Sequence, residues 1–173
     1  AAATSWAKRS IESPVNSSAQ PCADASIVIR IMSSLVKHSD VEVGFQLPSV
    51  TMTFTRDHLV AYAHASGDMN PIHREEEFAK SVGLPDVIAH GMLTMGLVGN
   101  VVTNWLKDIN AIKSFSVKFS SPVVVPNNSE GTLVEFTGKI EEKSDNKQIK
   151  IGLEARCQGT KVLGRSVIVA QLS

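Results

Sequence analysis

The segment Asp68-Met69-Asn70-Pro71-Ile72-His73 places a carboxylate and an imidazole five residues apart around a proline. Pro71 restricts the residue before it to an extended backbone, which stiffens the turn. A stiff turn can direct both side chains at one point, where a water molecule could be oriented, deprotonated and given its proton back. The spacing predicts that Asp68 and His73 are a catalytic pair, and an ordinary Asp-x-Asn-Pro turn is the alternative.

The pair His90-Gly91 directly precedes a long apolar run. If that run is a helix, the Gly91 amide lies among the unpaired N–H groups at its positive end. Such an amide could stabilise the thioester oxygen that becomes negative when water attacks the β-carbon of a 2-enoyl thioester. We therefore predict that Gly91 and His90 bind substrate, and a structural histidine at a helix start is the alternative for His90.

Three histidines near these motifs, His64, His73 and His90, raise the alternative of a zinc site. Their spacing matches no familiar ligand pattern, and no cysteine lies among them. We therefore expect neither a bound metal nor another cofactor.

Helical patterns surround the motifs. Thr55 is a good N-cap for a helix over residues 56–65 with an apolar face of Leu59, Val60 and Ala63. Glu75, Glu76 and Glu77 favour the start of a short helix that runs to Val82, because the helix dipole favours carboxylates at that end. From Gly91 to about Leu106 the side chains are apolar almost all round, which predicts a buried helix.

The remainder of the chain alternates apolar and polar residues, as expected for an antiparallel sheet with one buried face. Turn-rich breaks such as 126–128, 144–146 and 158–160 separate the segments. The simplest arrangement is an α+β fold in which a bent antiparallel sheet wraps around the buried central helix, a single hot-dog fold. The expected strands lie near residues 50–54, 114–119, 134–140, 148–157 and 162–172.

Composition sets the class of protein. The chain has 173 residues, 43% of them hydrophobic, and 17 basic residues balance 17 acidic ones. This balance does not favour nucleic acid or an anionic membrane as a partner. No apolar run approaches the roughly 20 residues of a membrane span. Two distant cysteines, Cys22 and Cys157, form no disulfide framework, which fits a cytoplasmic location.

The first part of the chain differs from the remainder. Residues 1–31 are rich in Ala and Ser and show no sustained periodicity, and Met32 opens a new stretch. We expect residues 1–40 to be a poorly ordered or foreign extension and residues 41–173 to be the folded domain.

Two stretches together, residues 62–73 (Tyr-Ala-His-Ala-Ser-Gly-Asp-Met-Asn-Pro-Ile-His) and 88–93 (Ile-Ala-His-Gly-Met-Leu), resemble the signature of MaoC-like, hydratase-2-type hot-dog enzymes. Within that group the chain is most similar to the catalytic B subunit of actinobacterial (3R)-hydroxyacyl-acyl-carrier-protein dehydratases. The resemblance extends over about residues 41–173. Where some relatives have a serine near the substrate, this chain has Gly99, which puts a hydroxyl contact there in doubt.

The resemblance implies a hydro-lyase that reversibly dehydrates (3R)-hydroxyacyl thioesters to trans-2-enoyl thioesters in fatty-acid metabolism. Asp68 and His73 would be catalytic, Asn70 would support the loop, and the Gly91 amide would bind the thioester carbonyl. The substrate would be an acyl-CoA or acyl-ACP thioester. The expected assembly is a homodimer, or a heterodimer with a related non-catalytic hot-dog subunit.

Two alternatives for function remain at this stage. A hot-dog thioesterase would need a carboxylate at the carbonyl carbon instead of the β-carbon. A non-catalytic acyl-binding partner subunit would have no need for both Asp68 and His73.

Overall fold

A computed structural model describes residues 36–173. Of the extension predicted over residues 1–40, residues 1–35 lie outside the described residues. Residues 36–40 are described: Val36 packs against the core, and the His38 amide donates to the Ser173 carbonyl at 3.3 Å. Ordered contacts therefore begin before residue 41, where we expected the domain to start.

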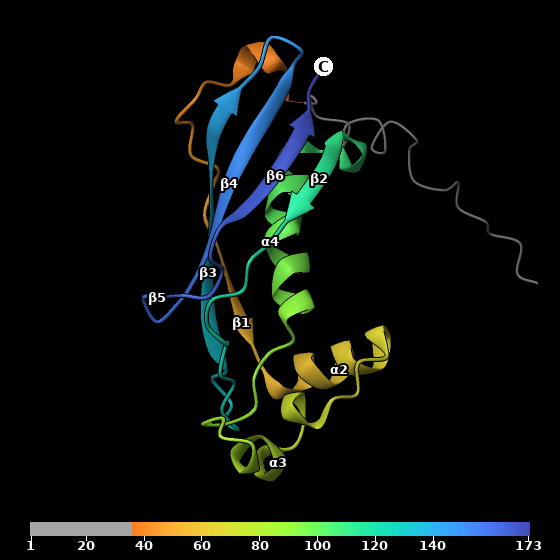
Figure 1. Ribbon diagram of the computed structural model, residues 1–173, viewed down its shortest axis with the longest axis vertical. Helices are drawn as coiled ribbons and strands as arrows, with labels where there is room; N and C mark the ends of the chain where they lie inside the picture. The colour runs from red at the N-terminus through yellow and green to blue at the C-terminus, as the bar shows by residue number, and fades with distance from the viewer. Residues whose placement is uncertain (1–35) are drawn as a thin grey trace, which may run out of the picture. The chain divides into compact units, whose positions relative to one another are not determined.

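The elements follow the sequence pattern in chain order (Figure 1). The helices and short 3₁₀ turns are η1 (His38–Asp40), α2 (Arg56–Ser66), η2 (Pro71–His73), α3 (Glu76–Ser81), α4 (Gly91–Leu106) and η3 (Ile109–Ala111). The strands are β1 (Val50–Phe54), β2 (Ile112–Ser116), β3 (Thr132–Lys143), β4 (Gln148–Cys157), β5 (Thr160–Lys161) and β6 (Ser166–Gln171).

The strands form one antiparallel sheet in the order β1-β3-β4-β6-β2, and the short β5 pairs with β4. The long β3–β4 hairpin is the centre of this sheet. Within residues 36–173, β1 and β2 are its two edges. The strict alternation predicted for β3 holds, since its residues from Thr132 to Ile140 alternate between buried and more exposed positions.

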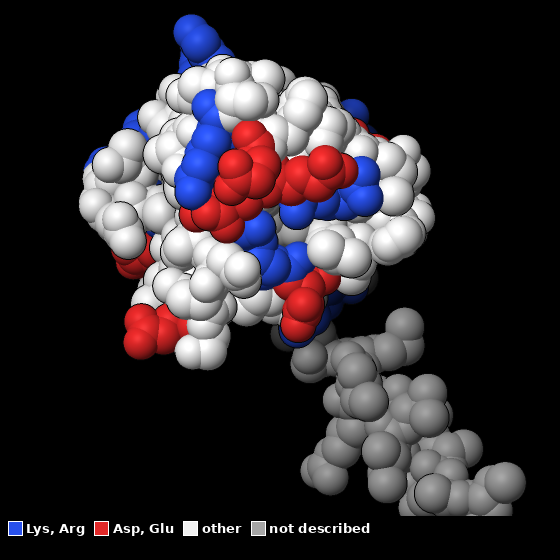
Figure 2. Space-filling model, turned by 90° about the horizontal axis from the view of Figure 1, so that it is seen from below, with Lys and Arg blue, Asp and Glu red and all other residues white. Residues whose placement is uncertain are grey.

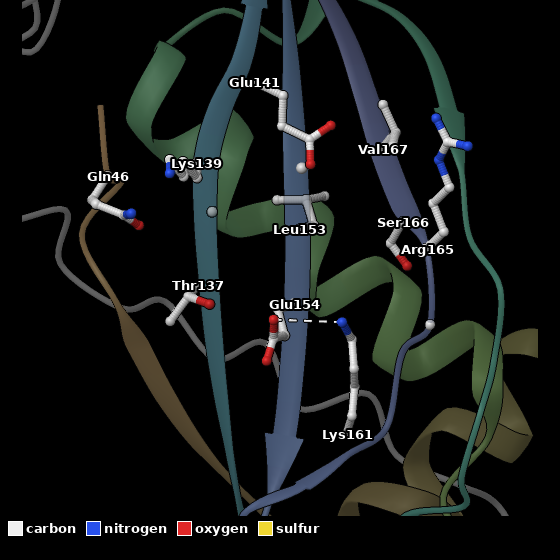
Figure 3. A pocket seen from close by; sticks show the side chains of 13 residues that line it. Gln46, Thr137, Lys139, Glu141, Leu153, Glu154, Lys161, Arg165, Ser166 and Val167 are labelled. Carbon is white, nitrogen blue, oxygen red and sulfur yellow. Dashed lines mark ion pairs between the residues drawn. The ribbon is translucent and has the colours of Figure 1, made fainter. Parts of the chain in front are cut away.

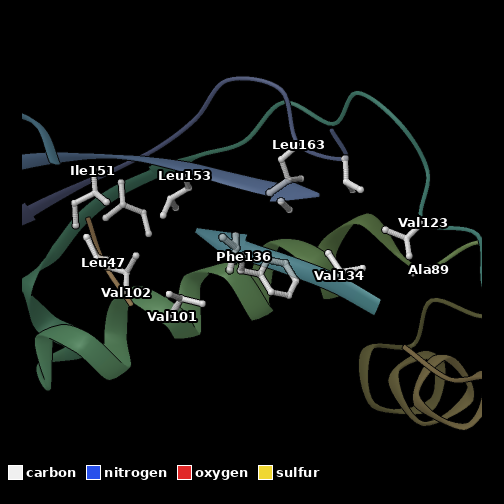
Figure 4. Close-up of a cluster of buried hydrophobic side chains, with 14 of the residues drawn as sticks. Leu47, Ala89, Val101, Val102, Val123, Val134, Phe136, Ile151, Leu153 and Leu163 are labelled. Carbon is white, nitrogen blue, oxygen red and sulfur yellow. The ribbon is translucent and has the colours of Figure 1, made fainter. Parts of the chain in front are cut away.

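Helix α4 lies against one face of the sheet, and the core lies between them (Figures 1 and 4). The predicted hot-dog arrangement is confirmed. The helix buries the face that carries Val98, Val102 and Leu106. Its opposite face is more open, because the sheet covers one side only. That open side presents Met92, Gly96, Asn100 and Asn104.

Three details differ from the sequence expectations. Val60 is exposed although Leu59 and Ala63 of the same helix are buried, because the buried stripe is narrower than the pattern suggested. The last strand begins at Ser166 instead of residue 162, after the β5 turn. Phe119, predicted within a strand, lies beyond β2 and is half exposed.

Among residues 36–173, no helix combines the length and the hydropathy that crossing a bilayer requires.

Candidate active site

The loop after α2 is built from side-chain to backbone hydrogen bonds. Gly67 ends α2 with a φ of 77°, a left-handed conformation that glycine adopts without strain. The Asp68 carboxylate then accepts from the Asn70 amide, and the Asn70 side chain accepts from the Ile72 amide, both at 3.2 Å. The Asn70 side chain therefore caps η2.

His73 is held with a defined ring orientation. It is only 8% exposed, and its Nδ1 lies 2.7 Å from the carbonyl oxygen of Ile88. Because a carbonyl oxygen can only accept, Nδ1 carries the hydrogen and Nε2 of the neutral ring carries a lone pair. The tautomer is therefore the one in which Nε2 can accept a proton.

His90 lies directly beside His73. The two rings stack with centroids 3.8 Å apart and an interplanar angle of 28°, and Tyr62 covers His90 at 4.9 Å. His90 is 1% exposed, and its Nε2 lies 3.1 Å from the backbone carbonyl oxygen of Asp68. Burial lowers the pKa of His90, and the hydrogen bond to Asp68 opposes that shift only in part.

Asp68, His73 and His90 form one group, here called the Asp68 cluster. One carboxylate oxygen and one nitrogen from each ring all lie within 4.8 Å of one another, with Asp68 exposed and both histidines buried. A single water could reach both Asp68 and His73 at hydrogen-bond distances of about 2.6–3.2 Å. The structure therefore brings together the pair predicted from the sequence.

The same three groups could hold a metal ion such as zinc, with Asp68 as the third ligand. The zinc set considered from the sequence differs, because His64 lies exposed on α2 and is not part of this group.

Gly91 begins α4, so its amide lies at the positive end of that helix. The first intrahelical bond of α4 runs from the Thr94 amide to the His90 carbonyl, at 3.2 Å. A Cβ on Gly91 would lie 3.1 Å from the ring of Phe119, so glycine allows an aromatic wall to approach the helix start. The predicted oxyanion position is thus an amino end of a helix beside an apolar ring.

Sequence reasoning assigned no role to Tyr62 and Arg74, which the structure places at the site. Tyr62 lies one turn after Leu59, on the inward side of α2, and that spacing was the available signal. Arg74 donates to the Met69 carbonyl at 2.8 Å and so stabilises the loop between α2 and η2. The available sequence signal for Arg74 was its place directly after the signature stretch 62–73.

A second polar group, here called the Arg56 network, consists of Arg56, Glu76, Lys80 and Asp86. Arg56 donates to Asp86 at 2.5 Å and to the Val125 carbonyl at 2.7 Å, and Glu76 lies 3.5 Å away. Lys80 pairs with Glu76 at 2.6 Å and lowers the pKa of that carboxyl. Figure 2 shows acidic and basic side chains interleaved on the end of the domain that carries α3.

Pockets lie on both faces of the sheet. On the outer face, a polar pocket of about 460 Å³ is lined by Lys139, Glu141, Glu154, Lys161 and Arg165, with Lys161 paired to Glu154 (Figure 3). It contains no member of the Asp68 cluster.

On the α4 side, two apolar pockets of about 340 and 470 Å³ share Met52 and Leu97. The first contains Tyr62 and Leu93, and the second ends near Trp105. These two adjoining pockets are here called the apolar groove. Tyr62 lines one end of it and contacts His90, but no member of the Asp68 cluster lines either pocket.

Comparison with known proteins identifies the family. Residues 41–156 match the family model described as the MaoC like domain, so the chain belongs to that family and the predicted resemblance is confirmed. It is 33% identical over 105 residues to an (R)-specific enoyl-CoA hydratase of Rhodospirillum rubrum, covering 60% of this chain and 72% of that protein.

Longer proteins also match. The chain is 33% identical over 157 residues to the fatty acid synthase beta subunit TOXC of Cochliobolus carbonum, covering 85% of this chain and 7% of that protein. A solved structure titled MaoC-like dehydratase superimposes with a TM-score of 0.77 at 40% identity, covering 79% of this chain and 42% of that one. The chain thus spans only part of the length of these relatives.

Proposed function

We propose that this protein is a hydro-lyase that adds water reversibly to trans-2-enoyl thioesters and forms (3R)-3-hydroxyacyl thioesters in fatty-acid metabolism. The observation that carries the proposal is the convergence of Asp68 and His73 beside the amino end of α4. The match to an (R)-specific enoyl-CoA hydratase over most of that protein's length supports both the reaction and its stereochemistry.

In the hydration direction, one water lies between the Asp68 carboxylate and Nε2 of His73. Asp68 accepts one hydrogen bond from this water, and His73 takes its other proton as the oxygen bonds to C3 of the substrate. The C2–C3 double-bond electrons move toward the thioester, whose oxygen is stabilised by the Gly91 amide. Return of the proton to C2 completes the addition of water, and the reverse sequence is dehydration.

The apolar groove supports an acyl substrate. It begins at Tyr62, which contacts His90, and continues along α4 through Leu97 toward Trp105. From Leu93 to Trp105 the helix rises about 18 Å. A fatty acyl chain is the kind of ligand that fits a long groove with few polar groups.

The thioester carrier is proposed to be coenzyme A or an acyl carrier protein, since both bear phosphate. No Asp or Glu lies within residues 109–129 or 155–173, whereas Lys118, Lys161 and Arg165 do. These segments adjoin, because the Lys118 amide donates to the Arg165 carbonyl at 3.2 Å. Phe119, which covers Gly91, follows Lys118 directly, so Lys118 lies near the proposed oxyanion position, whereas Lys161 pairs with Glu154 on the outer face.

We also propose that residues 41–173 work as one hot-dog unit in a dimer, with an identical chain or with a related unit lacking the catalytic pair. The open edges at β1 and β2, and a similar structure of which this chain covers only 42%, support a paired arrangement. Light scattering after size exclusion tests this assembly, and an active monomer would contradict it. We separately propose a cytoplasmic location, based on the widely spaced cysteines.

The experiment that tests the reaction is an ultraviolet assay of the full chain with 2-enoyl-CoA thioesters of increasing length. We expect loss of the enoyl chromophore and formation of the (3R) product on chiral analysis. Free thiol is measured in the same samples. Thiol release with the double bond intact would instead identify a thioesterase, and no change in either signal would contradict an enzymatic role.

A further inference from the structure

We propose that His90 is a positioning residue, which holds both the Asp68 loop and the His73 ring in place and does not contact substrate. This inference rests on the proposed hydration reaction. Its basis is the set of contacts that His90 makes with α2, with the loop and with η2.

The burial of His90 favours an indirect role over direct contact with substrate. At 1% exposure it lies under the site, between the ring of Tyr62 from α2 and the ring of His73 from η2. A substrate that reaches the exposed Asp68 therefore meets His73 before His90.

The hydrogen bond from His90 has a defined direction. Its Nε2 lies 3.1 Å from the Asp68 carbonyl oxygen, which can only accept, so Nε2 carries the hydrogen. The bond fixes the backbone of Asp68, while the Asn70 amide fixes one oxygen of its carboxylate at 3.2 Å. His90 thus restrains the catalytic carboxylate from the backbone side.

The surroundings of the other ring nitrogen disfavour the charged form of His90. Within residues 36–173, Nδ1 of His90 is buried and has no hydrogen-bond partner. A second proton there would be a buried N–H without an acceptor, beside His73 and Arg74 and with only Asp68 as a nearby acid. The partner-free Nδ1 and the burial of the ring both oppose a second proton on His90.

Ring stacking is the second restraint. His73 is held at Nδ1 by Ile88, and that single bond leaves the ring free to tilt about it. The parallel contact with His90 at 3.8 Å restricts this tilt and so directs Nε2 toward Asp68. One buried imidazole therefore orients both members of the catalytic pair.

Two substitutions separate the two restraints. His90→Phe keeps an aromatic ring against His73 but removes the donor to Asp68. His90→Gln keeps an N–H donor at a similar distance from the backbone but removes the ring. Val98→Ala, fully buried in the helix α4 that His90 precedes, is the matched control for destabilisation alone.

The test measures kcat, KM and the pH profile of kcat for these three variants. We expect His90→Phe to lower kcat by about 100-fold, the effect of a displacement of about 1 Å, with little change in KM. His90→Gln should recover part of that loss, and Val98→Ala should lower only the melting temperature. Wild-type kcat in His90→Phe, or equal effects on kcat from all three variants, would overturn the positioning role.

A second measurement does not depend on turnover. In ¹⁵N NMR spectra of the wild type, the Nε2–H proton of His90 should exchange slowly, because it is buried and bonded to Asp68. This signal should be missing in His90→Phe. Its absence from the wild type would overturn the positioning role, whereas its presence in a protein without hydratase activity would overturn only the proposed reaction.

Discussion

The Arg56 network and the Asp68 cluster are both polar groups of this domain, but their partners differ. In the Arg56 network, Arg56 and Asp86 each have a charged partner within 2.5 Å and a backbone partner as well. In the Asp68 cluster, Asp68 has no ion-pair partner among the described residues, and Nδ1 of His90 has no hydrogen bond. The exposed Asp68 carboxylate is therefore free of a competing ion pair, as the catalytic role that we propose for it requires.

This difference separates stability from activity. Substitutions in the Asp68 cluster should lower turnover and leave folding intact, and those in the Arg56 network should do the reverse. The variants below test the separation from both sides.

The largest effect is expected on turnover. Asp68→Asn and His73→Ala should each lower kcat/KM by about 10²- to 10⁴-fold, the usual contribution of general acid–base catalysis. Asp68 is exposed, so its amide variant should melt near the wild-type temperature. Steady-state kinetics and calorimetry check both statements, and a variant that is inactive only because it is unfolded would count against the comparison.

The next effect is expected on stability. Arg56→Met removes the cation while keeping much of the side-chain length, and it leaves Asp86 partly buried without its partner. The free energy of unfolding should fall by about 1–3 kcal/mol. At about 2–4 °C per kcal/mol for a domain of this size, the melting temperature should drop by several degrees. A kcat that falls as far as in Asp68→Asn would show that the two groups are not separate.

A smaller effect concerns pH. Burial lowers the pKa of His90 in the folded state, so below pH 6.5 the unfolded chain binds more protons than the folded one. The His90 contribution to stability is thus fully present above pH 6.5 and is lost as the pH falls toward the folded-state pKa. In this pH range, the free energy of unfolding measured with denaturant should rise with pH. His90 should contribute less than about 1.4 kcal/mol per pH unit to that rise. The slope should decrease in His90→Phe, and an unchanged slope would contradict the assignment.

The smallest effect is expected from metal removal. Although the Asp68 cluster could hold a metal ion, the proposed reaction needs only a water and two proton-accepting groups. Exhaustive chelation should therefore leave kcat/KM unchanged. A loss of activity that zinc restores would replace the water mechanism by a metal-assisted one.

Much of the site could be predicted from the sequence because its signals are local. The N-cap Thr55, the turn around Pro71 and the limits of α4 each depend on neighbouring residues, and the structure has them where they were expected. The approach of Asp68 to His73 is also local, since five residues separate them.

What the sequence did not reveal depends on contacts between distant segments. The stacking of His90 on His73 joins residues 17 positions apart, and the covering of Gly91 by Phe119 joins residues 28 positions apart. The exposed side of α4 follows from how far the sheet curves, which residue periodicity does not encode. The role of His90 therefore became visible only in three dimensions.

The central claim is that Asp68 and His73 act on the same water, and a double-mutant cycle on kcat/KM tests it most directly. Asp68→Asn, His73→Ala and the double variant are compared with the wild type in the enoyl-thioester assay. Residues that act as a unit are strongly non-additive, so the double variant should be about as slow as the slower single variant. Rates near the wild type, or losses that multiply in full, would show that the two groups do not share one water.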